Sequence, residues 1–418
     1  DIPALLAHTR RILQLADHEV VRLTVDGAEV FDRAGNPVEK KEMIVDWDVS
    51  SAEKGGYAHF MIKEIMEQPQ ALSATISPRI DASGGIVLDG ISLTEEELRR
   101  FNRLYIVACG SAYHAGVVGK YVLEKLARIP VEVDLASEFR YRDPIVDERT
   151  LVIIISQSGE TADTLAALRE AKRRGAHILS IVNVVGSSIA RESHTVLYTW
   201  AGPEIAVATT KAYSTQMAVL DLLAVYLAAQ RGTISAEEAN RLTAAIAALP
   251  AQVEQILSSR EQIQYYASQY FNHDSVFFIG RNLDYALGME GSLKLKEISY
   301  IHSEAYASGE LKHGTISLIE PGTLVIALGT YGPLFDKAMS NVIEVKARGA
   351  SVLALTTENR REALSSRVDG ILTIPETELP LLPLLGVVPL QLFAYYVALQ
   401  RGCDIDKPRN LAKSVTVE

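Results

Sequence analysis

The stretch Leu151-Val-Ile-Ile-Ile-Ser-Gln-Ser-Gly-Glu-Thr161 joins an apolar run directly to a turn that is rich in hydroxyl groups. Its five leading apolar residues, four of them β-branched, are typical of a buried strand in a parallel sheet. A helical pattern follows at once over residues 162–172. The stretch therefore predicts a strand, a turn and a helix in succession, which is the unit from which α/β folds are built.

The hydroxyl groups of Ser156, Ser158 and Thr161 fall where this strand ends and the helix begins. Free backbone N–H groups and the positive end of the helix dipole point to that place, which suits a phosphate group. The turn contains no Lys or Arg, so neutral donors would hold the phosphate, as suits a sugar phosphate that must bind and leave. An ordinary turn in which Ser or Thr caps the helix fits the same residues equally well.

The chain contains a repeat. Residues 101–110 resemble residues 274–281, Leu151-Val-Ile-Ile resembles Leu324-Val-Ile-Ala, and Arg174-Gly175 with its following strand resembles Arg348-Gly349. Each half alternates short apolar strands with helices, which predicts parallel sheets with right-handed crossovers and helices on both faces. Ligands of such sheets bind beyond the carboxyl ends of the strands, where Gly110-Ser111 and the 156–161 turn are expected.

The two halves differ in chemistry. The second half has Gly329-Thr-Tyr-Gly-Pro333 in place of the hydroxyl cluster, so the first half is the better candidate for binding phosphate. The second half adds Glu290, Lys294 and Glu297, whose spacing places them on one helix face. From spacing alone a solvated stripe of salt bridges is the more common meaning of such a pattern. Likewise, His313 before Gly314 is more often a loop histidine than an acid–base group.

Composition limits the possible functions. The 418 residues carry a net charge of −11 and no long basic run, which argues against nucleic acid or an anionic membrane as the main partner. No apolar stretch is expected to span a membrane, and the first residues do not resemble a signal peptide. The two cysteines, Cys109 and Cys403, indicate an intracellular protein. The nine histidines show no metal-ligand spacing, so neither a metal nor a cofactor is expected.

Other segments predict further elements. Residues 20–45 indicate short strands with turns at Asp26-Gly27 and at 34–37. A helix is expected over 57–68, ended by Pro69, and a connector over 82–95. Long helices are expected over 236–259, packed against the second half, and over 382–400. The tail after Cys403 has few charges at its end and two apolar anchors, so it is expected to be able to dock.

These motifs resemble the glutamine–fructose-6-phosphate aminotransferases (isomerising), also called glucosamine-6-phosphate synthases. The resemblance covers almost the whole chain, and its most specific motifs are 155–164, 204–211, 295–302, 309–314 and 407–418. It implies two tandem sugar-isomerase (SIS) domains, each a doubly wound, flavodoxin-like parallel sheet flanked by helices. The implied domain bounds are 1–70 for the end of a glutaminase domain and its linker, 71–250 and 251–397 for the SIS domains, and 398–418 for an active-site tail.

The family's glutaminase domain uses an N-terminal cysteine as nucleophile, and neither Cys109 nor Cys403 matches it. Most of the glutaminase domain is therefore expected to be absent from this chain, which alone should not use glutamine.

The resemblance also implies roles for single residues. Glu297 would move the proton between C1 and C2, beside the active-site lysine Lys294, and one base can serve both carbons. His313 would assist ring opening in the neighbouring subunit. Lys413 would form an imine with the open-chain sugar, and burial under a docked tail would keep its amine neutral. The implied substrate contacts are Ser156, Gln157, Ser158 and Thr161 for the phosphate, and Gly110, Ser111, Val207, Thr209, Arg409 and Ala412 elsewhere. The family often has Thr-Ser where this chain has Ser111-Ala112.

The function implied is conversion of fructose 6-phosphate to glucosamine 6-phosphate through an imine and a C1/C2 proton transfer, in a cytoplasmic homodimer, with glucose 6-phosphate as a further ligand. Two other classes stay open. One is another enzyme with two SIS domains, such as a fructosamine-phosphate deglycase or a phosphosugar isomerase, against which the 1–70 segment argues. The other is a non-catalytic sugar-phosphate sensor, which would need the phosphate loop but not Glu297, His313 and Lys413, whose joint presence argues against it.

Overall fold

The structure, a computed structural model, describes residues 9, 11–13, 15–16, 18–25, 27–40, 42–44, 53–88, 90–91 and 93–417. The chain divides into two compact units, Asp1–Gly56 and Tyr57–Glu418, and each is described by itself.

The smaller unit consists of short antiparallel strands, as the sequence predicted. Strand β1 (Arg11–Ile12) pairs with β5 (Met43–Ile44), while β2 (Val20–Thr24), β3 (Gly27–Phe31) and β4 (Pro37–Val38) form a three-stranded sheet in that order. The turn before β4 is held by the Asp32 carboxylate, which accepts 2.8 Å hydrogen bonds from the backbone N–H groups of Ala34 and Asn36. The other expected turn includes Asp26, which lies outside the described residues.

The first half of the larger unit contains a five-stranded parallel sheet with the order β10-β9-β8-β6-β7. Its strands are β6 (Arg103–Ala108), β7 (Val131–Leu135), β8 (Thr150–Ser156), β9 (His177–Val182) and β10 (Thr195–Tyr198). The strand predicted over 151–155 is β8, which extends one residue further at each end, and every residue of β8 is buried. This flavodoxin-like order reverses between β6 and β8, and ligands bind at such a reversal.

The second half repeats the arrangement, with the parallel order β12-β11-β13-β14-β15. Its strands are β11 (Ser275–Gly280), β12 (His302–Ala307), β13 (Leu324–Gly329), β14 (Ser351–Thr357) and β15 (Gly370–Ile374). The repeat read from the sequence is thus confirmed as two sheets of the same topology.

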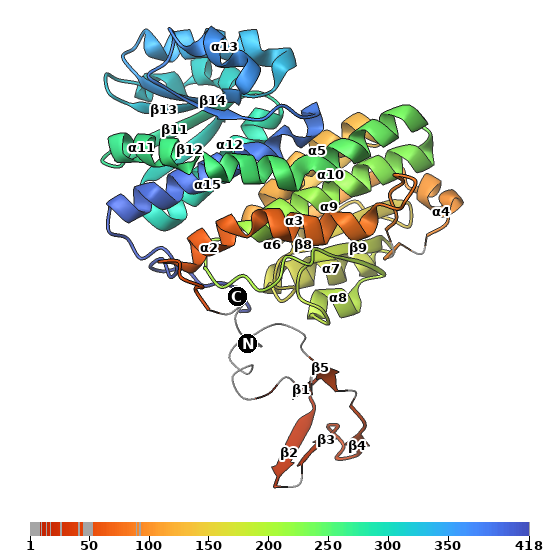
Figure 1. Ribbon diagram of the computed structural model, residues 1–418. Helices are drawn as coiled ribbons and strands as arrows, with labels where there is room; N and C mark the ends of the chain where they lie inside the picture. Colours follow the sequence, from red (N-terminus) through yellow and green to blue (C-terminus); the bar gives the residue numbers. More distant parts are fainter. Residues whose placement is uncertain are drawn as a thin grey trace. The chain divides into compact units, whose positions relative to one another are not determined.

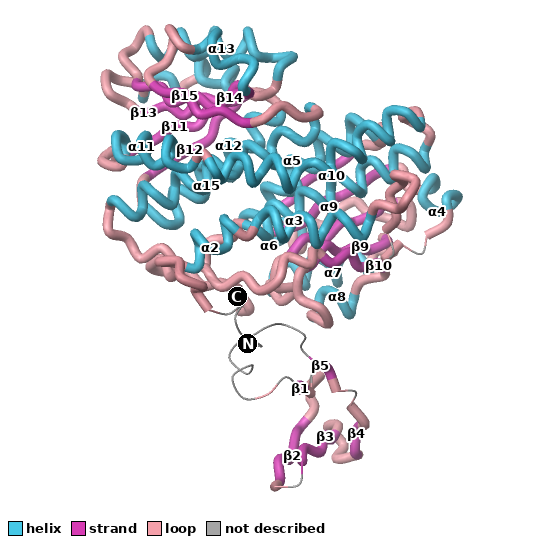
Figure 2. Tube along the Cα trace, viewed as in Figure 1, coloured by secondary structure: helices cyan, strands magenta, loops and turns pink. Residues whose placement is uncertain are grey.

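Helices cover both faces of both sheets (Figure 1 and Figure 2). One large core lies between the sheets, where helices of both halves meet; these are α3 (Gln68–Ile76), α5 (Gly110–Leu126), α9 (Lys211–Arg231), α10 (Ala236–Ser258), α11 (Arg260–Tyr270), α12 (Leu283–Ser299) and α15 (Leu382–Gln400). Two smaller cores lie on the outer faces, under α6 (Ala136–Phe139), α7 (Ala162–Arg173) and α8 (Ser188–Glu192) in the first half and under α13 (Phe335–Lys346) and α14 (Arg361–Leu364) in the second. The shared core brings α5 against α12, and therefore joins the two halves.

The remaining elements are short. They are α2 (Phe60–Met66), α4 (Glu95–Arg100) and the 3-10 helices η2 (Ser77–Arg79), η3 (Ser308–His313), η4 (Thr315–Leu318), η5 (Gly332–Leu334), η6 (Glu358–Arg360) and η7 (Leu379–Leu381). Helix α10 matches the predicted bridge and starts at Ser235, whose side chain accepts from the Glu238 N–H. It packs on α3 and α9 as well as on α15, so it contacts both halves and not the second alone.

Two expectations are corrected. Pro69 does not simply end a helix: α2 ends at Met66, and Pro69 lies in the first turn of α3, where its missing N–H is not needed. The expectation that no apolar stretch is long enough for a membrane span is also wrong, because Lys211–Arg231 and Leu379–Gln400 are long and apolar enough by length and composition. Both are core helices, and α15 is buried from Leu382 to Ala398.

Candidate active site

A cavity of about 290 Å³ opens at the carboxyl edge of the first sheet, where the strand order reverses between β6 and β8. It is lined by Cys109, Gly110, Ser111, Ala112, Ile155, Ser156, Gln157, Ser158, Thr161, Thr164, Val207, Thr209, Gln216, Glu297, Leu411, Ala412, Lys413, Ser414 and Val415. The lining therefore combines the ends of two strands, helices α9 and α12, the 207–209 loop and the C-terminal tail.

The hydroxyl-rich turn forms one wall. Ser156 Oγ accepts a 3.0 Å hydrogen bond from the Gly159 N–H and lies 3.2 Å from the Thr161 hydroxyl. Thr161 occupies the N-cap position of α7, but its side chain makes no capping hydrogen bond. The Ala162 N–H instead donates to the carbonyl of Val415 in the tail, at 3.0 Å. No side chain of the turn therefore caps α7, and Ser156, Ser158 and Thr161 all line the cavity.

The turn depends on Gly159. Its φ of +69° lies in the left-handed region, and a Cβ placed there would lie 2.0 Å from Ser187 Oγ. Only glycine allows the backbone to approach Ser187 this closely.

The acidic and basic residues of α12 form the floor. Lys294 Nζ lies 2.6 Å from Glu297 Oε2 and 3.3 Å from Glu290 Oε1, and it donates to Ser111 Oγ at 2.9 Å. Ser111 donates to Glu290 Oε1 at 2.8 Å, and His114 Nδ1 lies 2.9 Å from Glu290 Oε2. Because Ser111 and His114 belong to α5, this cluster connects the two halves under the cavity.

The stripe on α12 is buried, not solvated as its spacing alone favoured. Glu290 and Lys294 are fully buried, whereas the Glu297 side chain is 21% exposed and reaches the cavity. Burial lowers the pKa of Lys294, but the Glu290 and Glu297 carboxylates more than offset this, so the pKa stays above its usual value. Burial raises the pKa of Glu290, and Lys294 and His114 lower it below the usual value. Glu290 and Lys294 are thus held in their charged forms, and of the three α12 residues Glu297 is the one that lines the cavity.

The C-terminal tail docks along the cavity, as its composition allowed. The Val207 N–H donates to the Asp406 carbonyl at 3.0 Å, and the Ser414 hydroxyl lies 3.1 Å from that of Ser158. Arg409 stacks on Tyr300, with its guanidinium carbon 4.1 Å from the ring centroid. Lys413 thereby lines the cavity.

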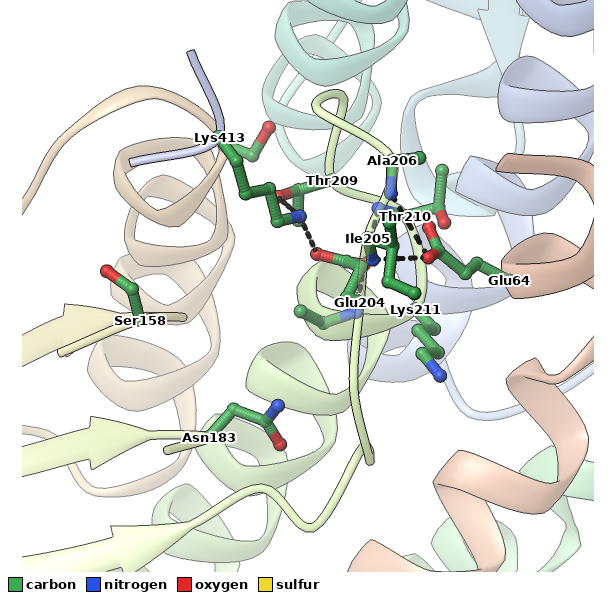
Figure 3. Close-up of polar contacts among 12 residues, drawn as sticks. Glu64, Ser158, Asn183, Glu204, Ile205, Ala206, Thr209, Thr210, Lys211 and Lys413 are labelled. Atoms are coloured by element: carbon green, nitrogen blue, oxygen red, sulfur yellow. Dashed lines mark hydrogen bonds and ion pairs between the residues drawn. The ribbon is translucent and has the colours of Figure 1, made fainter. Parts of the chain in front are cut away.

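Lys413 forms an ion pair with a buried carboxylate. We expected burial under the docked tail to be the main influence on this amine, but the structure places a carboxylate beside it. Its Nζ donates to Glu204 Oε2 at 2.6 Å and to Thr209 Oγ1 at 3.5 Å (Figure 3). The lysine side chain is 25% exposed, whereas that of Glu204 is wholly buried. Burial raises the pKa of Glu204, but Lys413 and two backbone N–H groups outweigh it and hold the pKa below its usual value.

Three of the expected site residues do not line the cavity. Lys294 lies beneath it in the charged cluster. Arg409 orders the tail through Tyr300, whose hydroxyl accepts from the Arg409 N–H at 2.9 Å. His313 ends η3 and is exposed. The other expected residues all line the cavity, namely Glu297, Lys413, Ser156, Gln157, Ser158, Thr161, Gly110, Ser111, Val207, Thr209 and Ala412.

Several residues at the site were assigned no role from the sequence. Gln216 lines the cavity from α9, and its Oε1 is buried without a hydrogen-bond partner, so it can accept from a ligand. Its position in an apolar helix hid it, since α9 reads as core. Glu204 is the first residue of the 204–211 motif, but only the tertiary structure shows that it pairs with Lys413 of the tail.

The corresponding position of the second sheet is filled by the protein itself. Asp284 is buried where β11 and β13 part, and it accepts hydrogen bonds from the Thr330 hydroxyl and, at 3.0 Å, from the Tyr331 N–H. Burial raises the pKa of Asp284 to about 6 despite these donors. A carboxylate thus occupies the place in the second sheet that corresponds to the hydroxyl-rich turn of the first.

Both cysteines are free thiols. Cys109 lines the cavity, and burial raises the pKa of its thiol. Within the described part of the chain, no group of three or more His, Cys, Asp or Glu residues is arranged to hold a metal ion.

Comparison with protein families finds the SIS domain twice, over residues 97–226 and 269–401. The whole chain is 56% identical to the glutamine–fructose-6-phosphate aminotransferase (isomerising) of Clostridium acetobutylicum and 50% identical to that of a strain of Thermus thermophilus. It covers 69% and 68% of these relatives, respectively.

Solved structures agree. The C-terminal domain of the glucosamine-fructose-6-phosphate aminotransferase from Francisella tularensis matches 85% of this chain and all of its own length, at 38% identity and a TM-score of 0.81. A glucosamine-6-phosphate deaminase from Thermotoga maritima also matches 85% of this chain, but at 25% identity and a TM-score of 0.66.

Proposed function

Because the chain belongs to the glutamine–fructose-6-phosphate aminotransferase (isomerising) family, as its isomerase part with two SIS domains, we propose that the cavity between β6, β8 and α12 is where fructose 6-phosphate becomes glucosamine 6-phosphate. The open-chain sugar forms an imine with Lys413, ammonia displaces the lysine, and a proton moves between C1 and C2.

One observation carries this proposal: a single cavity is lined by the hydroxyl turn, by Glu297 and by Lys413, which come from three distant parts of the chain. A phosphate on the turn would anchor one end of a hexose phosphate. The reacting carbons at the other end would then meet a carboxylate that can move a proton and an amine that can form an imine.

The phosphate contacts that we propose are Ser156, Gln157, Ser158 and Thr161. Sugar hydroxyl groups would meet Gly110, Ser111, Val207, Thr209 and Ala412. Lys294 would hold Glu297 through the 2.6 Å ion pair, and Arg409 would hold the tail on Tyr300. Ser111 accepts from Lys294 and donates to Glu290, so a sugar hydroxyl would donate to the remaining lone pair of its oxygen.

Other SIS proteins fit less well. A sensor has no use for a carboxylate and an amine at the reacting end of its ligand. The match to a deaminase is at 25% identity, against 56% to a synthase along the entire chain. We also propose a cytoplasmic location, which suits two free thiols.

The phosphate turn can be tested by ligand binding. Ser158→Ala and Thr161→Ala are each expected to weaken binding of fructose 6-phosphate and of glucose 6-phosphate alike, by about 1–3 kcal/mol, because each removes a donor to the same phosphate. Calorimetry measures both ligands, and Ser258→Ala, an exposed hydroxyl on α10, serves as the matched control. Unchanged affinity in both cavity variants would move the phosphate elsewhere.

We propose further that the enzyme is a homodimer in which His313 enters the partner's cavity. His313 is exposed and does not line the cavity of its own chain, and a two-fold dimer would exchange one such residue for another.

Mixing inactive variants tests this arrangement. His313→Ala and Glu297→Gln are each expected to be inactive, and subunit exchange between them should restore activity to at most about half of the parent value per heterodimer. In such a heterodimer one site carries both substitutions and the other site carries neither. Absence of recovery, when exchange is demonstrated by differently tagged chains, would place His313 outside the shared site.

A further inference from the structure

The Glu204 carboxylate, which pairs with Lys413, is held in place by further hydrogen bonds. Glu204 Oε2 accepts a 2.6 Å hydrogen bond from the Lys413 ammonium group, while Oε1 accepts 3.0 Å hydrogen bonds from the N–H groups of Thr210 and Ala212. Those two groups open helix α9, so the carboxylate also lies at the positive end of a long helix dipole. Glu204 therefore cannot turn away from Lys413 without leaving two buried donors unpaired.

A second carboxyl group supports the same loop from the opposite side. Glu64 of α2 accepts hydrogen bonds from the N–H groups of Ile205 at 2.5 Å and Ala206 at 3.2 Å through Oε1 (Figure 3). Its Oε2 is buried and has no hydrogen-bond partner among the described residues. Burial, and then the neighbouring Glu204, raise the pKa of Glu64 to about 8.

The charged groups around the loop therefore have different states. The pKa of Glu64 responds to Glu204, Lys413 and Lys211, and the pKa of Glu204 responds to Lys413. Lys211 is already held by Glu67, at 2.8 Å. With Glu64 neutral near pH 7, Glu204 remains as the carboxylate that faces Lys413.

We propose that Glu204 is a catalytic residue for imine formation, the general base that aims the Lys413 amine into the cavity and takes its proton, and that Glu64 fixes the loop that carries Glu204. This inference rests on the proposed function, because it assumes that Lys413 is the residue that attacks the sugar. Glu204 then acts first on the Lys413 amine, and on the sugar only when it returns the proton to the departing oxygen.

The proton balance closes within the pair. An ammonium cannot attack a carbonyl, so Lys413 first passes one proton to the Glu204 carboxylate, and its lone pair forms the N–C2 bond. The carbonyl oxygen takes up protons from the attacking nitrogen and from the Glu204 carboxyl, and it leaves as water. The products are a protonated imine and a Glu204 carboxylate again, so no further acid, base or oxidant is needed.

The test is trapping of the imine. The chain is incubated with fructose 6-phosphate and cyanoborohydride, and mass spectrometry of peptides measures the reduced sugar adduct on Lys413 from pH 7 to 9.5. In Glu204→Gln the amide oxygen can still accept from Thr210 and Ala212, so the loop is retained. Trapping at pH 7 is expected to fall by about 10²-fold or more, because a general base is lost.

The pH profile separates this role from a structural one. In the parent, proton transfer inside the pair makes trapping nearly independent of pH over this range. In Glu204→Gln the rate is expected to rise about tenfold per pH unit, because the amine must now lose its proton to the solvent, and lysine side chains in general are almost wholly protonated over this range. A variant that merely distorts the loop would be slower by the same factor at every pH, and that result, or a parent-like rate and profile, would overturn the proposal.

Two controls keep the outcomes distinct. Calorimetry with glucose 6-phosphate shows whether the phosphate turn of Glu204→Gln is intact. If the parent chain binds fructose 6-phosphate but yields no adduct at Lys413, the proposed function fails and not the role of Glu204.

Glu64 is tested in the same assay. Glu64→Gln keeps an oxygen for the Ile205 and Ala206 N–H groups and mimics a neutral acid, so trapping should stay within about threefold of the parent at pH 7. Glu64→Ala removes the acceptor and should lower trapping at least tenfold at that pH. Equal trapping by both variants would remove Glu64 from the proposal.

Discussion

Replacing Glu297 by Gln is expected to slow the conversion of fructose 6-phosphate to glucose 6-phosphate by about 10²–10⁴-fold, with binding of either sugar phosphate retained. The amide keeps the size of the side chain but cannot accept a proton from carbon. Lys294 keeps its other partners, Glu290 at 3.3 Å and Ser111 at 2.9 Å, so the buried ammonium is not left uncompensated. Exchange of the C1 and C2 protons with deuterated water measures the effect directly.

The matched control is Glu254→Gln, an exposed glutamate on α10 that does not line the cavity. It should exchange protons at the parent rate. A Glu297→Gln enzyme that does the same would reduce Glu297 to a partner in the salt bridges of α12.

Replacing Lys413 by Arg is expected to abolish both the borohydride-trapped adduct and the formation of glucosamine 6-phosphate from fructose 6-phosphate and ammonia. A guanidinium keeps the positive charge and can still bond Glu204, but it does not lose its proton in proteins and so cannot attack a carbonyl. Glucose 6-phosphate should still bind, because the phosphate turn is untouched.

Lys407→Arg provides the control, since Lys407 lies in the same tail with an exposed side chain away from the cavity lining. It should retain both activities. If Lys413→Arg retained synthesis, ammonia would have to attack the sugar without a lysine imine, and the tail would serve only to close the cavity.

Much of the fold was predictable because it depends on local patterns. The apolar run of β8 and the helical period of α7 identify a parallel strand and its crossover, and the recurrence of this pattern identifies the second sheet. Helices α10 and α15 were located to within a residue because both are long, α10 with apolar residues at helical spacing and α15 with an almost continuous apolar stretch. Pro69 was misread, since a proline that ends one helix and a proline that begins the next look alike in sequence.

The candidate site was only partly predictable. The hydroxyl turn, Glu297 and Lys413 could be identified from their motifs. The spacing of Glu290, Lys294 and Glu297 did not show whether their face of α12 is solvated or buried. Burial decided that point, because Glu290 and Lys294 meet Ser111 and His114 of the other half.

By itself, the sequence determined which segments form strands and helices, that they repeat, and which turn presents hydroxyl groups, because these properties follow from residues close together in the chain. The tertiary structure decided which carboxylate faces which amine. Glu204 and Lys413 are far apart in sequence, as are Ser111 and Glu290, and only the docked tail and the packing of α5 on α12 bring them within hydrogen-bond distance. The pKa of an ionisable group depends on its burial and on neighbouring charges, so the protonation of these groups could not be predicted without the tertiary structure.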